Sequence, residues 1–551
     1  TDGFITHQPD GDERFAFTRR RLLRGQLLYA PMVASEWRSR LVLSATDYAG
    51  QPDYNMERGT AGEDFRRTSY ANAPSEDVVE TLLLSWENTL RLGPSLGLTS
   101  ITALMDSRQA YVRDFDGLEE EGGTNPATAE GLNLSQELRL DWEPSSTLRG
   151  IVGLYGGRFD DAYVYSSEDI RVPASYFAPL PLAGELIEVR TDFYSEQFNE
   201  AVNGAVFAEF DWDWRPWLSL TFGLRYDRET LDARNRNETT RADAYLASPS
   251  GVQQLPFAGD VLGAILGAQP GIDILTLANA TGIAPQTDGL QGGETTYEAL
   301  LPKLGLRLAL SKNWMTFATY SEAYRAGGVS VDGSSGEVYP YDPEYTVNGE
   351  IGLRGKVLAG ALESSLNLFY TDWTDQQVPV LQNQFYIVQN AGKSRLYGAE
   401  ASLRWRPSPR WKGDLGLGYV DTQFLEYEDG DNSYRGNDFP LAPPVSASIG
   451  GQWMHPQGWE VGLRFSYQDH AFTRPSNSED EYSESRRLLS ARMGWQGQHW
   501  AVFLSGSNLL DEDYATETFQ FPEGYVGADG ARGYGAYGAP RTLSLSLEWQ
   551  L

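Results

Sequence analysis

The stretch "WLSLTFGLRYD" at residues 217–227 alternates strictly between large apolar side chains and small or polar ones. Its apolar positions are Leu218, Leu220, Phe222, Leu224 and Tyr226, and the positions between them are Ser219, Thr221, Gly223, Arg225 and Asp227. Because successive side chains of a β-strand point to opposite faces, this pattern predicts a strand with one apolar and one wet face.

The same alternation recurs along the chain, in "ALESSLNLFY" (361–370), "AEASLRW" (399–405) and "RTLSLSLEWQL" (541–551). In the last of these it continues to the final residue, Leu551. No run of about 18 consecutive apolar residues occurs, so the sequence predicts no transmembrane helix. The expected fold is all-β.

The expected connections between the strands alternate in length. The short ones lie at 30–36, 92–95, 143–146, 214–217, 311–314, 356–360, 406–410, 455–458 and 496–498. The long ones lie at 50–76, 115–129, 166–197, 234–295, 326–343, 376–387, 425–440, 471–483 and 511–540. Short turns at one end and long loops at the other are typical of a transmembrane antiparallel up-and-down β-barrel in an outer membrane. A soluble sandwich or propeller does not segregate its loops in this way.

The tryptophans support the same fold. Of the 15 in the chain, 12 lie at or near the short connections. These are Trp37, Trp142, Trp214, Trp217, Trp314, Trp405, Trp411, Trp453, Trp459, Trp495, Trp500 and Trp549. An indole ring can be half wet and half apolar, so this distribution predicts an aromatic girdle at one membrane interface.

The pattern yields about 19 strands, the first near 14–30 and the last at 541–551. Bacterial single-chain barrels have an even number of strands because both ends return to the periplasm. A chain with an odd number of strands that ends on the short-turn side must start on the long-loop side. Because both ends of a complete barrel lie in the periplasm, we expect an odd number of further strands before this chain. Three further strands would give a barrel of 22, whose lumen must be plugged.

Composition excludes several other kinds of protein. The chain has no cysteine, which removes disulfides and thiolate metal sites. Its formal net charge of −32 repels polyanions, so no nucleic-acid partner is expected. The first residues, "TDGFITHQPDGDERF", lack the basic and apolar regions of a signal peptide, which predicts a mature or truncated start.

Several segments resemble the barrel of TonB-dependent outer-membrane receptors, in the order in which that family uses them. They are "RGQLLYAP" (24–31), "YSEAYRAGG" (320–328), "FYTDWTDQQVPV" (369–380), "NAGKSRLYGAEASLRWRP" (390–407), "NLLDEDY" (508–514) and "GAPRTLSLSLEW" (538–549). The resemblance spans essentially the whole chain. Residues 1–551 are therefore expected to form one TonB-dependent receptor β-barrel domain, N-terminally truncated and without the family's plug domain.

The resemblance implies a function in the outer membrane of a Gram-negative bacterium. It implies uptake of a scarce, bulky nutrient, most often a ferric siderophore, energised by the TonB complex through an N-terminal segment that these residues lack. The expected partners are an iron-chelate ligand, the TonB complex, outer-membrane lipid and lipopolysaccharide. The last strand resembles the signal read by the outer-membrane assembly machinery, although it ends in Leu551 where the family usually has Phe.

Candidate ligand-binding residues are aromatic and arginine side chains on the long loops. They are Tyr324, Arg325, Tyr339, Tyr341, Phe385, Tyr386, Phe519, Phe521, Tyr525, Arg532, Tyr534 and Tyr537. Such a surface suits an anionic, aromatic iron chelate, through stacking and charge-assisted hydrogen bonds. Tyrosines of an outer girdle, or aromatics that pack the loops, would look the same in sequence.

Other chemistry has little support in the sequence. The acidic run Glu428, Asp429 and Asp431 lacks the spacing of a calcium loop, and a solvated loop or a cation bridge to lipopolysaccharide fits it better. The histidines, His7, His455, His470 and His499, are far apart and have no metal-ligand spacing. We therefore predict no catalytic residues, no metal site and no cofactor.

Three questions stay open at this stage. The 62-residue loop 234–295 could fold as a helical cap over the lumen or be a disordered insertion. The barrel could instead be a passive diffusion porin, although porins normally have 16–18 strands, or an outer-membrane enzyme or adhesin. Receptors for cobalamin, haem and saccharides share the same pattern.

Overall fold

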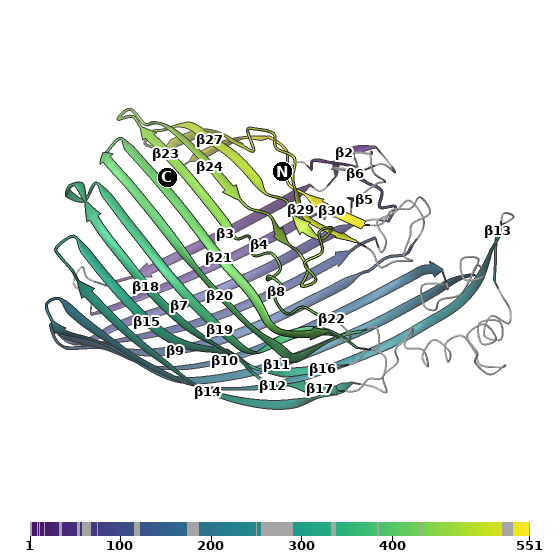
Figure 1. Cartoon of the computed structure of the whole chain (residues 1–551), viewed down its shortest axis with the longest axis horizontal. Helices are drawn as coiled ribbons and strands as arrows, with labels where there is room; N and C mark the ends of the chain where they lie inside the picture. The colour runs from purple at the N-terminus through teal and green to yellow at the C-terminus, as the bar shows by residue number, and fades with distance from the viewer. Residues whose placement is uncertain are drawn as a thin grey trace.

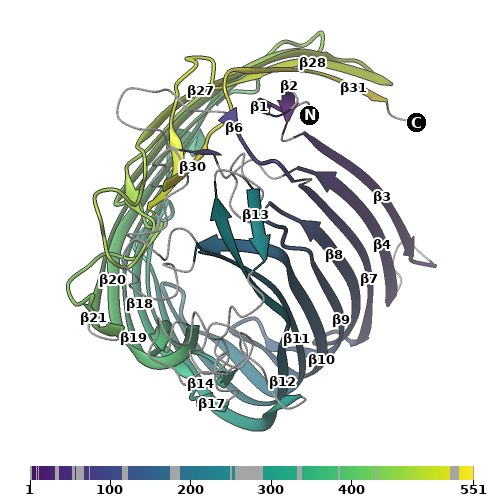
Figure 2. The same ribbon diagram turned by 90° about the vertical axis from the view of Figure 1, so that its right-hand side faces the viewer.

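A computed structural model describes most of the chain. The described residues are 3–7, 9, 11–15, 17–31, 36–51, 56–57, 68–73, 75–114, 122–173, 187–248, 251–254, 290–331, 338–382, 385–429, 432–520 and 533–549. They form an antiparallel barrel whose strands follow one another in chain order (Figures 1 and 2). No helix among these residues is long and apolar enough to cross a membrane.

Among the described residues the barrel comprises 21 strands, of which β13 (Gly251–Gln254) and β22 (Asn432–Ser433) are short hairpin strands. The other 19 form the wall, which agrees with the predicted number. They are β3 (Thr18–Tyr29), β4 (Trp37–Gly50), β7 (Glu76–Gly93), β8 (Leu96–Val112), β9 (Ala127–Ser145), β10 (Leu148–Pro173), β11 (Ile187–Arg215), β12 (Leu218–Ser248), β14 (Gln291–Ala309), β15 (Trp314–Arg325), β18 (Glu344–Val357), β19 (Leu362–Gln382), β20 (Phe385–Ser408), β21 (Trp411–Asp429), β23 (Val445–Met454), β24 (Trp459–Gln468), β27 (Arg486–Gln496), β28 (Trp500–Ser507) and β31 (Thr542–Trp549).

The predicted segregation of connections is confirmed. Turns such as those between β7 and β8 or β11 and β12 contain only two residues. In Figure 1 the strand ends next to the short connections lie at the left-hand end of the barrel, and those next to the long connections lie at the right-hand end. The chain enters the wall at the long-connection end through β3 and leaves it at the short-connection end through β31.

Three predicted loops are partly wrong, because strands extend into them. β10 and β11 pair without a long break as far as Pro173 and Glu188, within the predicted loop 166–197. β12 continues to Ser248 within the predicted loop 234–295. β19 and β20 pair through the whole predicted loop 376–387, up to Gln382 and Phe385. The extension of β12 is mostly polar in sequence, so it lacks the apolar alternation that identifies a strand. The extension of β19 is apolar instead, and its Val378 and Val380 are buried in a small core with Phe424 and Tyr427.

The two faces of the wall differ as the alternation predicts. On β12, Phe222 and Leu224 point outward and are 48% and 49% exposed. Arg225 lies on the opposite parity and contacts inner-wall side chains of β10 and β11. In a water-soluble protein such exposed leucines would be costly, whereas here they form the face that lipid covers.

The predicted tryptophan girdle is also confirmed in position. Each of the 12 tryptophans lies at or beside a strand end next to a short connection. Ten of them are exposed: Trp37, Trp142, Trp214, Trp217, Trp405, Trp411, Trp459, Trp495, Trp500 and Trp549. A belt of exposed indoles at one end of the barrel marks the membrane interface there.

Tyrosines form a second level on the outer wall, toward the long connections. Tyr320 and Tyr370 are exposed, and each donates a hydrogen bond to a carboxylate two residues further along its own strand, Glu322 and Asp372. The half-buried Tyr467 donates a 3.2 Å hydrogen bond to Asp469, just past the end of β24. Carboxylates are unfavourable in the hydrocarbon region, so these pairs mark where the apolar belt ends.

Four small sheets lie at the long-connection end. One joins β1 (Ile5–His7), β2 (Asp12–Phe15) and β6 (Thr68–Ser69), and another joins β29 (Ala515–Gln520), β30 (Gly533–Tyr537) and β5 (Met56–Glu57). The other two are the hairpin of β16 (Gly328–Val331) with β17 (Val338–Tyr341) and that of β25 (Ala471–Phe472) with β26 (Tyr482–Ser483). The long connections are therefore partly structured.

Candidate functional site

The inner wall near the short connections carries a repeated arrangement of glycine, phenylalanine and arginine. Gly352 of β18 lies opposite Phe317 of β15, and a side chain at this glycine would start 2.1 Å from the phenyl ring. The ring therefore lies flat against the neighbouring strand. The Arg354 guanidinium stacks on the same ring, 5.0 Å from its centroid. Gly494, Phe503 and Arg492 repeat this arrangement on β27 and β28, with a stacking distance of 3.6 Å.

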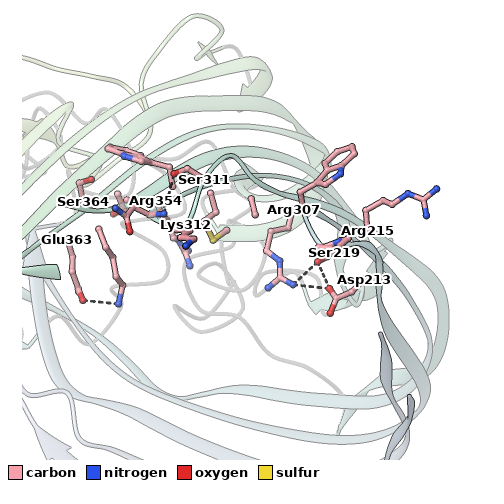
Figure 3. A pocket seen from close by; sticks show the side chains of 18 of the residues that line it. Asp213, Arg215, Ser219, Arg307, Ser311, Lys312, Arg354, Glu363 and Ser364 are labelled. Carbon is pink, nitrogen blue, oxygen red and sulfur yellow. Dashed lines mark hydrogen bonds and ion pairs between the residues drawn. The ribbon is translucent and has the colours of Figure 1, made fainter. Parts of the chain in front are cut away.

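A cavity of about 950 Å³ opens on this part of the wall (Figure 3). We call it the basal cavity. Strands β11, β12, β14, β15, β18, β19 and β20 contribute to it, together with the turns between them. Its charged lining residues are Asp213, Arg215, Arg307, Lys312, Arg354, Lys356, Glu363 and Arg404.

Two ion pairs neutralise part of this charge. Arg307 contacts Asp213 at 3.2 Å and donates a hydrogen bond to the Ser219 hydroxyl at 2.7 Å. The Lys356 ammonium contacts Glu363 at 3.1 Å. Figure 3 shows these two pairs on opposite sides of the cavity, with Arg215 pointing away from it.

Lys312, Arg354 and Arg404 form no ion pair within the described part of the chain. Arg404 lies opposite Glu363 in the register of β19 and β20, but the Glu363 carboxylate is already held by Lys356. Among the described residues, the lining of the basal cavity thus contains more cations than carboxylates.

The predicted ligand-binding residues divide into two groups. Tyr324 and Arg325 end β15, and the hairpin β16–β17 that follows carries Tyr339 and Tyr341. This hairpin lies against β14 and β20, and the Tyr297 hydroxyl donates a 2.9 Å hydrogen bond to the Tyr341 carbonyl.

Phe385 and Tyr386 begin β20 beside this hairpin, where the Val388 amide donates to Ser330 of β16. The structure thus brings the first six predicted residues to one side of the long-connection end.

Contacts within the protein already involve some of this group. The Tyr324 hydroxyl donates a 2.7 Å hydrogen bond to Asp227, which is only 3% exposed. Arg325 forms a 2.7 Å ion pair with the buried Glu344. Burial raises the pKa of the Tyr341 phenol above its ordinary value.

The second group belongs to the last long connection. Phe519 lies on β29, and Tyr534 and Tyr537 lie on β30. Tyr537 packs against the small core of Ile5 and Phe15, which fits the alternative of a packing aromatic. Phe521, Tyr525 and Arg532 lie outside the described residues. Figure 2 shows β30 and β17 on different sides of the opening, so the two groups do not form one cluster.

Sequence reasoning missed a tyrosine cluster on the inner wall of β8 and β10. The Tyr111 and Tyr163 hydroxyls are 2.8 Å apart, and Arg113 stacks over the Tyr111 ring at 4.4 Å. The Tyr165 hydroxyl donates to Asn125 at 3.1 Å. These tyrosines occupy the alternate positions of β8 and β10 that face the lumen. A search of the sequence for aromatic residues at such positions would have found them.

Three other sequence features can now be placed. Glu428 accepts a hydrogen bond from Ser433, and Asp429 accepts one from Tyr434, whereas Asp431 lies outside the described residues. No group of three His, Asp or Glu side chains suited to a metal occurs within the ranges that the structure describes. Most of the predicted cap in 234–295, residues 249–250 and 255–289, also lies outside these ranges.

Comparison with known proteins gives consistent matches. Residues 15–509 match the family model "TonB dependent receptor-like, beta-barrel". The ferric-pyoverdine receptor PbuA of Pseudomonas sp. strain M114 is 25% identical over 285 residues, which are 48% of this chain and 31% of that receptor. The match thus spans less than a third of that relative's length.

Solved structures share the fold at low sequence identity. The ferric yersiniabactin uptake receptor FyuA of Yersinia pestis superimposes with a TM-score of 0.75 and 16% identity, over 99% of this chain and 73% of FyuA. The siderophore receptor PiuA of Acinetobacter baumannii gives a TM-score of 0.69 and 14% identity, over 98% of this chain and 75% of PiuA.

Proposed function

The chain belongs to the family of TonB-dependent receptor-like β-barrels, and from this premise we propose that it serves in the uptake of a ferric siderophore energised through TonB. Its barrel lies in the outer membrane of a Gram-negative bacterium. The observation that carries the proposal is the family match, which spans residues 15–509. The named relatives add support, because the receptors PbuA and FyuA are named for ferric pyoverdine and ferric yersiniabactin.

The ligand would bind at the long-connection end of the barrel. The side that carries Tyr324, Arg325, Tyr339, Tyr341, Phe385 and Tyr386 combines aromatic rings with hydrogen-bond donors. Aromatic rings and hydrogen-bond donors both suit an aromatic, anionic chelate. Because Arg325 already pairs with Glu344 and the Tyr324 hydroxyl already donates to Asp227, we assign the hydrogen-bonding role chiefly to the other tyrosines of this group. Binding by the second group, Phe519, Phe521, Tyr525, Arg532, Tyr534 and Tyr537, stays a prediction.

Transport of radioactive iron tests the proposed function. A strain that lacks the gene is compared with the same strain carrying it, using a panel of ferric siderophores under iron limitation. We expect the gene to restore uptake of at least one chelate, and we expect a protonophore to abolish that uptake, because TonB transmits the energy of the inner-membrane proton gradient.

A passive diffusion porin would give a different result. Its uptake would continue in the presence of the protonophore and would rise linearly with chelate concentration. Either behaviour would contradict the proposal. Restored uptake of cobalamin, haem or a saccharide, without any ferric siderophore, would keep the TonB-dependent mechanism and change the ligand.

The other predicted partners are outer-membrane lipid with lipopolysaccharide around the outer wall and the assembly machinery at the last strand. They remain predictions. The contact with TonB would be made by a segment outside residues 1–551, as the sequence resemblance implies.

A further inference from the structure

The wall of the barrel divides between β14 and β15 toward the long-connection end. β14 pairs with β12 along nearly its whole length, from Gln291 to Leu308. Its pairing with β15 covers Lys303–Ala309, whereas β15 pairs with β18 along its full length, up to Arg325. Toward the long connections β14 therefore stays with β12, and the last residues of β15 stay with β18.

One side-chain contact joins the two parts of the divided wall. Asp227 of β12 has the same parity as the inward-pointing Arg225 and lies opposite Ala299 of β14. The Tyr324 hydroxyl of β15 reaches past β14 and donates a 2.7 Å hydrogen bond to this carboxylate. Tyr324 has the outward parity of its own strand, which it shares with the exposed Tyr320. The outer face of β15 and the inner face of β12 thus meet at this contact.

Asp227 is buried, at 3% exposure, and both of its carboxylate oxygens accept hydrogen bonds. Oδ1 accepts from Tyr324 and, at 2.6 Å, from the Asn203 side-chain amide. Oδ2 accepts two from the Arg225 guanidinium, at 2.8 and 2.5 Å. Of these three partners, Tyr324 is the one that belongs to the other part of the wall. Hydrogen bonds to an ionised carboxylate are stronger than neutral ones, so this contact is a firm attachment.

The hairpin β16–β17 follows closely on this end of β15 and has further anchors. The Tyr297 hydroxyl of β14 donates to the Tyr341 carbonyl at 2.9 Å. The Gln377 amide of β19 donates to the carbonyl oxygens of Ala326 and Asp342, at 2.8 and 3.1 Å, on either side of the hairpin. The hairpin is therefore attached to both parts of the wall. All these contacts join residues of the barrel itself, so they do not depend on what occupies the lumen.

We propose that Asp227 is a positioning residue of the ligand site. By holding Tyr324 across the division of the wall, it fixes the start of the hairpin β16–β17, which carries Tyr339 and Tyr341. A hairpin that is already in place binds a ligand with a smaller loss of conformational freedom. The role of Asp227 in ligand binding rests on the proposed function, in which these tyrosines bind a ferric siderophore.

Hydrogen exchange of the protein, purified from outer membranes in detergent, tests the attachment without any ligand. Tyr324→Phe should speed the exchange of the hairpin amides 328–331 and 338–341 at least about fivefold, because the hairpin loses one of its anchors. Tyr320→Phe is the matched control, because Tyr320 lies on the same strand and also donates to a carboxylate, Glu322, but on the outer wall. It should leave the exchange of the hairpin within about twofold.

Uptake of radioactive iron measures the consequence for the ligand site. The probe is the chelate of the panel above that the natural protein transports fastest. Tyr324→Phe and Asp227→Leu should each raise its half-saturating concentration about tenfold, with the maximal rate per folded receptor unchanged. Asp227→Asn keeps an oxygen that can accept from Tyr324, so it should stay within about threefold of the natural protein. The double variant Tyr324→Phe, Asp227→Leu should be no weaker than either single variant, because both changes remove the same contact.

The results separate this inference from the proposed function. Unchanged hairpin exchange in Tyr324→Phe would overturn the inference, whatever the protein transports. Additive effects in the double variant would also overturn it, because Tyr324 and Asp227 would then act separately, and so would a lowered maximal rate with unchanged half-saturation. If the exchange behaves as expected but no chelate of the panel is transported, the proposed function fails and the attachment of the hairpin through Asp227 is supported.

Discussion

Replacing Ile449 with arginine is expected to destabilise the barrel by ~2–4 kcal/mol, the cost of an arginine on the lipid face near the middle of the bilayer. Ile449 lies on the outer parity of β23 and is 56% exposed. It stands four residues from Trp453, which marks the membrane interface at the short-connection end. The measurement is urea unfolding of the folded protein in lipid vesicles, followed by tryptophan fluorescence.

The neighbouring residue provides the control. Ser448 has the opposite parity and lines an inner-wall cavity of about 460 Å³ that also contains Glu400. A Ser448→Arg side chain would enter wet space near a carboxylate, so we expect a change below about 1 kcal/mol. If both arginines cost the same, the assignment of lipid and lumen faces on β23 would be wrong.

The second large effect is expected at Gly458, in the turn between β23 and β24. Its φ is +91°, a left-handed conformation, and a Cβ there would lie 2.1 Å from the Gln496 carbonyl oxygen. This oxygen belongs to the backbone at the end of β27, where the strand pairing holds it in place. Gly458→Ala should therefore cost at least about 3 kcal/mol, from left-handed strain together with overpacking.

A substitution at Gly360 measures the backbone strain without the overpacking. It lies in the turn between β18 and β19 with a φ of +88°, and no atom lies within 4 Å of the position of its Cβ. Gly360→Ala should cost only about 1–2 kcal/mol, from the backbone conformation alone. The same unfolding measurement compares the two variants. Equal destabilisation would show that crowding against Gln496 contributes nothing.

The membrane-embedded part of the fold could be predicted from the sequence because lipid and lumen impose opposite requirements on adjacent residues. Positions 218–227 follow that rule, and β12 has the predicted faces. The rule ends where the strand leaves the membrane. Residues 234–248 are mostly polar at both parities in sequence, so they alternate no longer although they remain a strand.

The hairpin of β19 and β20 shows a second reason. Pro379 falls within its ladder, opposite Val388, and Asp375 has a positive φ where the register shifts. Proline and a positive φ are both typical of loops. Pro379 is compatible with the predicted loop at 376–387, and only the pairing of β19 with β20 identifies the strands.

The candidate sites were predictable to different degrees. Tyr324 and Arg325 could be proposed because aromatic and arginine residues stand out in a long connection. The cations of the basal cavity could not, because Arg354 and Arg404 are separated by 50 residues and each resembles any wet-face residue. Only the barrel register, which places β18, β19 and β20 side by side, brings them to one cavity.

The two aromatic levels of the outer wall have a consequence for the membrane in which the barrel can reside. On β24, Trp459 and Tyr467 are eight residues apart, and on β19 the same interval separates Leu362, opposite Trp405, from Tyr370. At about 3.3 Å per residue and a tilt near 40°, eight residues span a hydrophobic thickness of about 20 Å. An average bilayer has a hydrocarbon core of about 30 Å. The barrel is thus matched to a thin membrane, and a thicker one would have to compress around it, at an energetic cost that grows with every ångström of mismatch.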